Sequence, residues 1–300
     1  MNEETSTECL TGPTVAEVLA RCRQTLVRAG IESGSNEAVW LLEKALRTTL
    51  LRLTLEGGRR LTESECAEVE ALIGRRAARE PLQYILGSQE FYGLDFDVSP
   101  AVLIPRPETE LLVEEAKHVL IGKPPAIVVD VGTGSGCLAV TLASVVRNTS
   151  VYALDCSPSA LAVAQDNVAR HSLSGRVTCA LGDLCGPLES MGLAGQVDVI
   201  VSNPPYIAEA EWFSLQPEVR DFEPRVALVG GGVGIEVHRR LLDQAWRYLK
   251  PGGWLFMEMG IGQSEAVQQF ALATGRYAHP TIRRDAAQID RIIRMQSLGA

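Results

Sequence analysis

The 300-residue sequence predicts an α/β protein in which a doubly wound parallel sheet follows a separate helical region. Two observations carry this prediction. From residue 126 onward, short apolar runs alternate with stretches of helical periodicity, which is typical of a parallel sheet covered by helices on both faces. Before residue 80, apolar residues recur at helical spacing, so we expect helices without strands there.

The N-terminal region is predicted to form a small helical bundle, whose apolar residues lie on one stripe of each helix. Thr14 and Thr62 each stand three residues before a glutamate, which is the spacing of a capping box at a helix N-terminus. We therefore expect a helical domain over residues 1–87. Its helices are predicted over residues 14–29, 36–47 and 62–79.

Residues 88–104 are predicted to form a β-hairpin that joins the bundle to a second domain, residues 105–300. Apolar and polar residues alternate there around Gly93, which is typical of two short strands and a turn. Pro107 then opens a helix, because its fixed φ suits the first helical position.

The second domain begins with a strand over residues 126–131, a glycine-rich loop and a helix. Glycines let a ligand approach the backbone at the carboxyl end of a parallel strand, where doubly wound sheets bind their cofactors. The G-x-G-x-G spacing does not fit the dinucleotide fingerprint, and the P-loop lysine is missing, so a phosphate is not required. The loop consists of Gly132, Thr133, Gly134, Ser135 and Gly136.

Two further strands end in aspartates. Asp155 follows the strand over residues 151–154 and is placed to accept both hydroxyls of a ribose. Asp183 follows the strand over residues 177–181 and is placed to accept the exocyclic amine of an adenine. Each aspartate alone is more simply a cap or turn residue. Their succession at consecutive strand ends predicts one pocket.

The sequence Asn203-Pro204-Pro205-Tyr206 directly follows a fourth strand, residues 197–201. The two prolines have a fixed φ and no N–H, so this turn leaves backbone carbonyls as free acceptors. The side-chain oxygen of Asn203 and the Pro204 carbonyl are placed to accept two N–H bonds from a substrate amide or amine, while Tyr206 covers its face. Taken alone, the motif is equally explained as a strand-ending turn with a packed tyrosine.

Together these motifs resemble those of class I S-adenosylmethionine-dependent methyltransferases that modify amide or amino nitrogen. More narrowly, the chain from about residue 14 to residue 295 resembles the glutamine methyltransferases of peptide chain release factors. The sharpest similarity is the run Ile-Pro-Arg-Pro-Glu-Thr-Glu at residues 104–110, where the sister enzyme acting on a ribosomal protein differs. Val233-Gly234 departs from the family, which usually carries Asp-Gly there. Further similar runs lie at residues 81–87, 90–93, 223–224 and 227–228.

The resemblance implies a seven-stranded methyltransferase domain, including a late antiparallel strand over residues 291–295, with S-adenosyl-L-methionine as the cofactor. It implies that the glycine loop binds the methionine and ribose portion, that Asp155 binds the ribose hydroxyls, and that Asp183 and Leu184 bind the adenine. It also implies a protein partner, a release factor that presents its glutamine in a Gly-Gly-Gln loop.

For the substrate, the resemblance implies catalytic roles for Asn203, Pro204 and Tyr206, with Pro205 in the same binding turn and Asn203 also beside the cofactor. We expect direct transfer of the methyl group to the glutamine side-chain nitrogen, because two acceptor oxygens fix the amide in line. No general base and no metal is required, since the proton can leave after transfer. Arg106, Glu108 and Glu110 resemble residues near the substrate entrance or brace its loop, and Glu258 stays unassigned.

Composition limits the alternatives. A net charge of −9 lacks the basic footprint of a nucleic-acid-binding protein, which disfavours an adenine-N6 methyltransferase of nucleic acid. No apolar stretch has membrane-spanning length and no signal-peptide pattern is visible, so we expect a cytoplasmic protein that does not bind membranes. The seven cysteines are expected to be reduced core or near-core residues, and the four histidines lack metal-ligand spacing.

Besides the disfavoured nucleic-acid methyltransferase, three other functions stay open from the residues alone. A ribosomal-protein glutamine methyltransferase is the nearest competitor. A non-catalytic adaptor on the same fold is less consistent with a complete set of pocket motifs. A dehydrogenase is least consistent, because the glycine spacing is wrong and no hydride-accepting site is visible.

Overall fold

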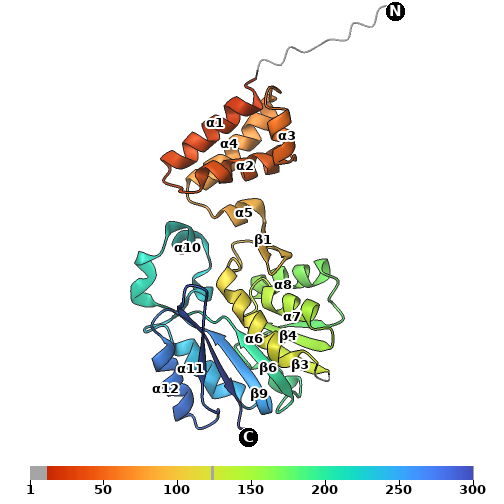
Figure 1. Cartoon of the computed structure of the whole chain (residues 1–300), viewed down its shortest axis with the longest axis vertical. Helices are drawn as coiled ribbons and strands as arrows, with labels where there is room; N and C mark the ends of the chain where they lie inside the picture. Colours follow the sequence, from red (N-terminus) through yellow and green to blue (C-terminus); the bar gives the residue numbers. More distant parts are fainter. Residues whose placement is uncertain (1–11, 123–124, 300) are drawn as a thin grey trace, which may run out of the picture. The chain divides into compact units, whose positions relative to one another are not determined.

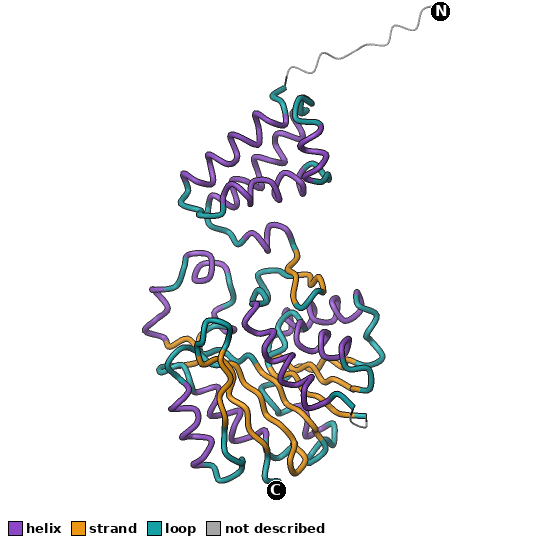
Figure 2. The backbone as a smooth tube through the Cα atoms, in the orientation of Figure 1, coloured by secondary structure: helices purple, strands orange, loops and turns teal. Residues whose placement is uncertain are grey.

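The computed structural model describes residues 12–122 and 125–299 and divides the chain into two compact units, Met1–Leu86 and Gly87–Ala300. The first unit is all helical, and the second contains the sheet (Figures 1 and 2). Each unit has its own hydrophobic core.

The three helices predicted in the first unit are present as α1, α2 and α4, and their core includes Leu26, Leu41 and Leu42. Two short helices, α3 and α5, were not predicted, because six and five residues are too few to show a helical period. The helices are α1 (Val15–Arg28), α2 (Gly34–Ala45), α3 (Leu50–Leu55), α4 (Glu63–Ala77) and α5 (Leu82–Leu86).

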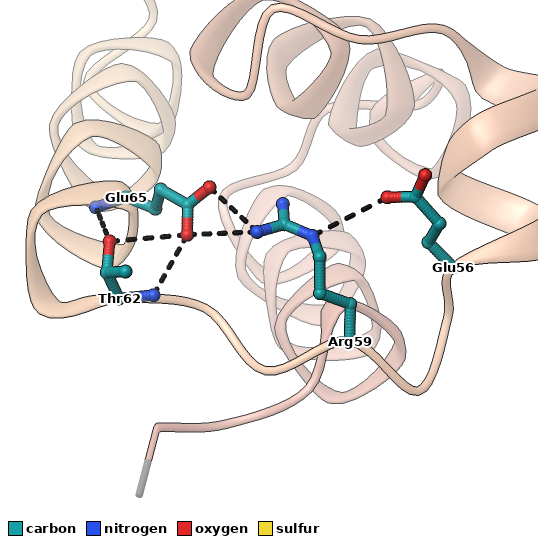
Figure 3. A network of polar contacts seen from close by, with 4 residues as sticks. All are labelled: Glu56, Arg59, Thr62 and Glu65. Atoms are coloured by element: carbon teal, nitrogen blue, oxygen red, sulfur yellow. Dashed lines mark hydrogen bonds and ion pairs between the residues drawn. The ribbon is translucent and has the colours of Figure 1, made fainter. Parts of the chain in front are cut away.

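Both predicted capping boxes are formed, at the N-termini of α1 and α4. In the second box, the Glu65 amide donates to the Thr62 hydroxyl at 3.2 Å and the Thr62 amide donates to the Glu65 carboxylate at 2.9 Å (Figure 3). Arg59 extends this network by donating to Glu65 and forming an ion pair with Glu56. The start of α4 is therefore fixed by local polar contacts that its sequence specifies.

The second unit is built on the predicted doubly wound sheet, with seven strands in the order β10-β11-β9-β6-β3-β4-β5. Neighbouring strands from β5 to β9 are parallel, and β10 and β11 are antiparallel. The strands are β3 (Ala126–Val131), β4 (Thr149–Asp155), β5 (Val177–Leu181), β6 (Val197–Ser202), β9 (Leu249–Glu258), β10 (Thr281–Arg284) and β11 (Asp290–Gln296).

Helices cover both faces of this sheet. On one face, α6, α7 and α8 pack on residues such as Val128, and on the other face α9, α11 and α12 pack on residues such as Val129. Successive residues of a strand point to opposite faces of the sheet. Because both faces are covered by helices, Val128 and Val129 each lie in a core, and the strands appear in the sequence as continuous apolar runs. The helices are α6 (Glu110–Leu120), α7 (Cys137–Val145), α8 (Pro158–Arg170), α9 (Pro187–Ser190), α11 (Glu236–Ala245) and α12 (Ser264–Ala273).

Two details of the sheet differ from the prediction. Strand β10 was missed, because its exposed and polar residues carry little apolar signal. From the sequence we expected a strand that begins at residue 254, after a turn at residues 251–253. Strand β9 instead begins at Leu249 and includes this turn, with an irregularity in its register with β6.

The predicted hairpin is present as β1 (Ser88–Phe91) and β2 (Leu94–Asp97), with Tyr92 and Gly93 at positive φ in a two-residue turn. Residues 98–104 form no strand, so the hairpin is shorter than predicted. Phe91 and Phe96 pack into a core of the second unit. The structure therefore groups the hairpin with the sheet.

An excursion between β6 and α11, residues 203–235, was not predicted as structured. Its two short strands pair in parallel, which closes the excursion on itself. It matters because its residues wall the site. Its elements are β7 (Ile207–Ala208), η2 (Glu209–Ser214), α10 (Pro217–Phe222), η3 (Arg225–Ala227) and β8 (Val229–Gly231).

Candidate functional site

A cavity of about 270 Å³ lies at the carboxyl ends of β3, β4, β5 and β6 in the second unit. The parallel register brings these four strand ends together, as expected for a ligand site in a doubly wound sheet. Most residues assigned to the pocket from the sequence line this cavity. They are Gly132, Thr133, Gly134, Ser135, Asp155, Asp183, Leu184, Asn203 and Pro205.

A second cavity of about 200 Å³ adjoins the first, because both are lined by Leu103, Arg106, Asn203 and Ala227. Tyr206 lines the second cavity only. Asn203 therefore stands at the boundary between the two spaces.

Two residues of the predicted site, Gly136 and Pro204, line neither cavity. Gly136 has a φ of 82° before α7, and a Cβ there would lie 3.3 Å from the Ala164 backbone. Its glycine is thus explained by helix packing, because a side chain would be strained and crowded. Pro204 is buried, and no donor among the described residues reaches its carbonyl.

The glycine loop is open to a ligand and supported from below. Gly132 and Gly134 have φ values of 75° and 54°, and a Cβ on either would meet no protein atom within 4 Å. Asp130 accepts hydrogen bonds from the Thr133 hydroxyl at 2.6 Å and the Ala139 amide at 3.2 Å. Its other carboxylate oxygen is buried without a partner in the described part of the chain.

Burial raises the pKa of Asp130 to about 7, although the hydrogen bonds from Thr133 and Ala139 oppose that shift. Because this pKa lies above its value in an unfolded chain, the contribution to stability is complete below about pH 4 and is lost as pH rises through 7. We expect Asp130→Asn to gain stability relative to the native protein between pH 5 and pH 8.

Urea denaturation of both proteins at the two pH values measures this gain, at about 1.4 kcal/mol for each pKa unit. Asp166→Asn is the control, since Asp166 is exposed on α8. An equal stability difference at both pH values would contradict the expectation.

The two aspartates that follow strands differ in their surroundings. Asp155 accepts from the amides of Gly134 and Ser157, both at 2.9 Å, so it braces the glycine loop. A carboxylate has about four acceptor positions, which leaves room for ligand hydroxyls. Asp183 forms an exposed ion pair with Arg240, which also lines the first cavity.

Asn203 is held by a buried polar network. Its Nδ2 donates to Thr109 Oγ1 at 3.0 Å, and Thr109 Oγ1 donates to Glu258 Oε2 at 2.7 Å. The Tyr206 hydroxyl donates to Glu258 Oε1 at 3.3 Å. Free backbone carbonyls were expected in this turn, but the Gln263 side-chain amide donates to the Tyr206 carbonyl at 2.7 Å, so this carbonyl is not a free acceptor. The turn is thus fixed from both sides.

Arg106 forms an ion pair with the buried Glu223, which also accepts from the Ile104 amide at 3.2 Å. This ion pair joins the loop that contains Arg106 to the segment 203–235 and holds Arg106 in the wall of both cavities. Glu110 accepts from the Tyr92 amide at 2.8 Å, so it braces the hairpin turn. Glu108 is exposed and lines neither cavity, and Val233 is likewise exposed outside both.

Several residues of the site were not assigned from the sequence, among them Leu103, Thr109, Glu223 and Arg240. Thr109 and Glu223 lie in runs that carry the family resemblance, which was the available signal, and Leu103 directly precedes such a run. Arg240 lies in α11 next to Arg239 and has no such signal.

Cys156 is exposed and lines the first cavity, which differs from the core or near-core placement expected of the cysteines. Across residues 12–122 and 125–299, no group of three or more His, Cys, Asp or Glu side chains is arranged to hold a metal ion. Within the same residues, every helix is too short or too polar to cross a membrane.

The chain is similar to known methyltransferases along most of its length. Residues 17–87 match the PrmC N-terminal domain, and residues 107–215 match the methyltransferase small domain. The release factor glutamine methyltransferase of Geobacter sulfurreducens is 45% identical over 282 residues, which cover 93% of this chain and 95% of that protein. The protein of the same name from Nitratidesulfovibrio vulgaris is 42% identical over 281 residues, covering 93% and 94%.

A solved structure extends the likeness in fold. The hMettl16 catalytic domain, in complex with MAT2A 3'UTR hairpin 6, superposes with a TM-score of 0.57 at 18% identity, covering 76% of this chain and 82% of that one. At this identity the superposition concerns the fold alone.

Proposed function

Because the chain belongs to the release factor glutamine methyltransferase family, we propose that its first cavity binds S-adenosyl-L-methionine and its second receives the glutamine side chain of a release factor. The activity is that of a protein-(glutamine-N5) methyltransferase. One observation carries the assignment of the two cavities: Asn203 stands between them, with an amide oxygen that accepts no bond from the described residues.

The first cavity fits this cofactor by its chemistry. The open space beside Gly132 and Gly134 admits a flat or extended ligand against the backbone. Among the described residues, the Ser135 hydroxyl of the cavity wall has no partner, and neither has one oxygen of Asp130 beneath the loop, which leaves polar capacity there for a cationic amine. Asp155 retains acceptor positions for two ribose hydroxyls, and Asp183 and Leu184 offer an acceptor and an apolar face to adenine.

When bound, S-adenosylmethionine supplies a methyl group on a positively charged sulfur. The residues of the chain have to make the glutamine amide react with it, although the nitrogen lone pair is delocalised into the carbonyl. We infer that Asn203 Oδ1 and the Pro204 carbonyl accept the two N–H bonds of the amide, because no described residue donates to either oxygen, although Pro204 lines neither cavity in this structure. They hold its nitrogen in line and stabilise the positive charge that develops there.

The other substrate contacts follow from the second cavity. Tyr206 lies on one side with its hydroxyl tied to Glu258, so its ring is placed to cover the amide. Leu103 and Ala227 provide apolar walls. Arg106 is held by Glu223 and has donors left for the backbone carbonyls of an incoming loop.

The protein partner is a release factor, and we place the reaction in the cytoplasm, where such factors act. The net charge of −9 favours encounter with a basic protein surface over binding to nucleic acid. The methylated residue is the glutamine of the Gly-Gly-Gln loop.

The direct test uses a methyl-labelled cofactor and four acceptors: a release factor, the same factor with its Gly-Gly-Gln glutamine changed to alanine, a ribosomal protein, and duplex DNA. We expect one labelled methyl group, which peptide mass spectrometry locates on that glutamine. The changed factor, ribosomal protein and DNA should stay unlabelled. Label in the ribosomal protein or DNA, with an unlabelled release factor, would overturn the proposed substrate.

A further inference from the structure

Asn203, Thr109 and Glu258, which are far apart in the sequence, are joined by a chain of two hydrogen bonds. Asn203 lies 94 residues from Thr109 in the sequence, and Thr109 lies 149 residues from Glu258. Thr109 is 3% exposed and Glu258 is 1% exposed, so water does not replace these bonds. Transferring a carboxylate from water into a protein core costs free energy, so the burial of Glu258 indicates that this residue does more than fill space.

We propose that Thr109 and Glu258 are positioning residues, which orient the Asn203 amide so that Oδ1 and not Nδ2 faces the substrate. The inference rests on the proposed function, because it concerns the same reaction. Thr109 and Glu258 perform this task by holding Asn203, and neither of them contacts the substrate.

The direction of each bond follows from the number of hydrogens available. An ionised carboxylate only accepts, so the single hydrogen of the Thr109 hydroxyl points to Glu258 at 2.7 Å. Thr109 Oγ1 is then left as an acceptor toward Asn203, which must present its NH₂ group at 3.0 Å. Since the two ends of an amide have almost the same shape, this sequence of donors and acceptors decides its orientation, and steric fit does not.

The orientation decides whether Asn203 can assist the reaction. With Nδ2 bound to Thr109, Oδ1 lies on the opposite edge of the amide and accepts an N–H of the substrate. In the flipped state, two NH₂ groups would face each other, and the substrate would lose an acceptor while its own donors stayed unpaired. Thr109 and Glu258 therefore exclude the unproductive state.

The surroundings of Glu258 link this orientation to pH. Burial raises the pKa of Glu258 to about 7, while Thr109, Arg291 and Tyr206 oppose the shift and Glu108 adds to it. The His238 ring lies 2.8 Å from the Glu258 backbone carbonyl, and burial keeps the pKa of His238 low, so it adds no charge. A protonated Glu258 can donate to Thr109, which frees the hydroxyl hydrogen to turn toward Asn203 and removes the preference.

The first test compares two substitutions at one position. Thr109→Val keeps the shape but removes the hydroxyl, and Thr109→Ser keeps the hydroxyl. We expect Thr109→Val to lower kcat about 10- to 100-fold, typical of losing a group that orients a reacting side chain, with cofactor Kd within about twofold. Thr109→Ser should restore kcat to within about threefold of the native value, because it keeps the same donor and acceptor.

The chain offers a matched control in Thr141→Val. Thr141 is a buried threonine of α7 whose hydroxyl has no partner among the residues described, so this variant should keep native kcat. A native kcat in Thr109→Val, or a serine variant as slow as the valine variant, would overturn the proposal. A release factor that is never methylated by the native enzyme would instead refute the proposed function.

A second test does not depend on the folding of Thr109→Val. The native kcat should rise from pH 6 to pH 8 with a midpoint at or below about 7, since the charge of a bound sulfonium favours the ionised carboxylate. Glu258→Gln is neutral at every pH and, like the protonated carboxyl group, can donate as well as accept, so we expect it to lose this rise and to stay near the low kcat of the native protein at pH 6. The same pH profile in both proteins contradicts the proposal.

Discussion

Replacing Asn203 by alanine is expected to lower the rate of methyl transfer about 100- to 1,000-fold, the usual effect of removing one preorganised polar group from a reacting centre. The variant loses the acceptor between the two cavities, so one N–H of the glutamine amide faces an apolar methyl group. Cofactor affinity should change by at most about 1 to 2 kcal/mol, because Asn203 contributes only one of many residues around the first cavity.

Single-turnover kinetics with a release factor measures the transfer step, and calorimetry with S-adenosylmethionine measures cofactor binding. Asn148→Ala is the matched control, since Asn148 is exposed after α7 and lines neither cavity. Retained turnover in Asn203→Ala would remove this residue from the mechanism. Equal losses of cofactor affinity and transfer rate would place Asn203 with the cofactor alone.

For Asp155→Ala we expect the opposite pattern, with cofactor affinity lost first. Two hydrogen bonds from ribose hydroxyls to a carboxylate are worth about 1.5 to 3 kcal/mol each, so Kd should rise about 100- to 10,000-fold. At saturating cofactor, kcat should fall much less, because Asp155 lies at the end of β4 and does not line the second cavity.

The structure adds a condition to the Asp155 experiment. The carboxylate also accepts from the amides of Gly134 and Ser157, so its loss disturbs the glycine loop as well as the ribose contacts. Asp155→Asn keeps the shape and one acceptor oxygen, and it should lose less affinity than the alanine variant. Thermal denaturation separates the two effects, and Asp166→Ala on exposed α8 serves as the control. An unchanged Kd in Asp155→Ala would refute the ribose assignment.

Measured together, the two substitutions test the division of the site into two cavities. A loss of transfer without loss of binding in one variant, and the reverse in the other, requires that the cofactor and the amide occupy separate spaces. Similar losses in both would show that the two cavities act as one binding site.

Most of the secondary structure was predictable because its signals are local. The capping box at Thr62 fixes a helix start within four residues, and strand β3 reads as a continuous apolar run because both of its faces are buried. The short α3 and the polar edge strand β10 escaped prediction, since neither carries a period long enough or apolar enough to be seen.

The sequence alone determined which side chains stand at the strand ends, because strand and turn residues follow one another along the chain. It therefore placed Asp155, Asp183 and Asn203 at one edge of a parallel sheet, as the structure has them. Only the tertiary structure decided what those side chains meet. The contact between Thr109 and Glu258 depends on the order of the strands in the sheet and on the loops that connect them. The two residues are 149 positions apart, and no local sequence pattern encodes a contact over that separation.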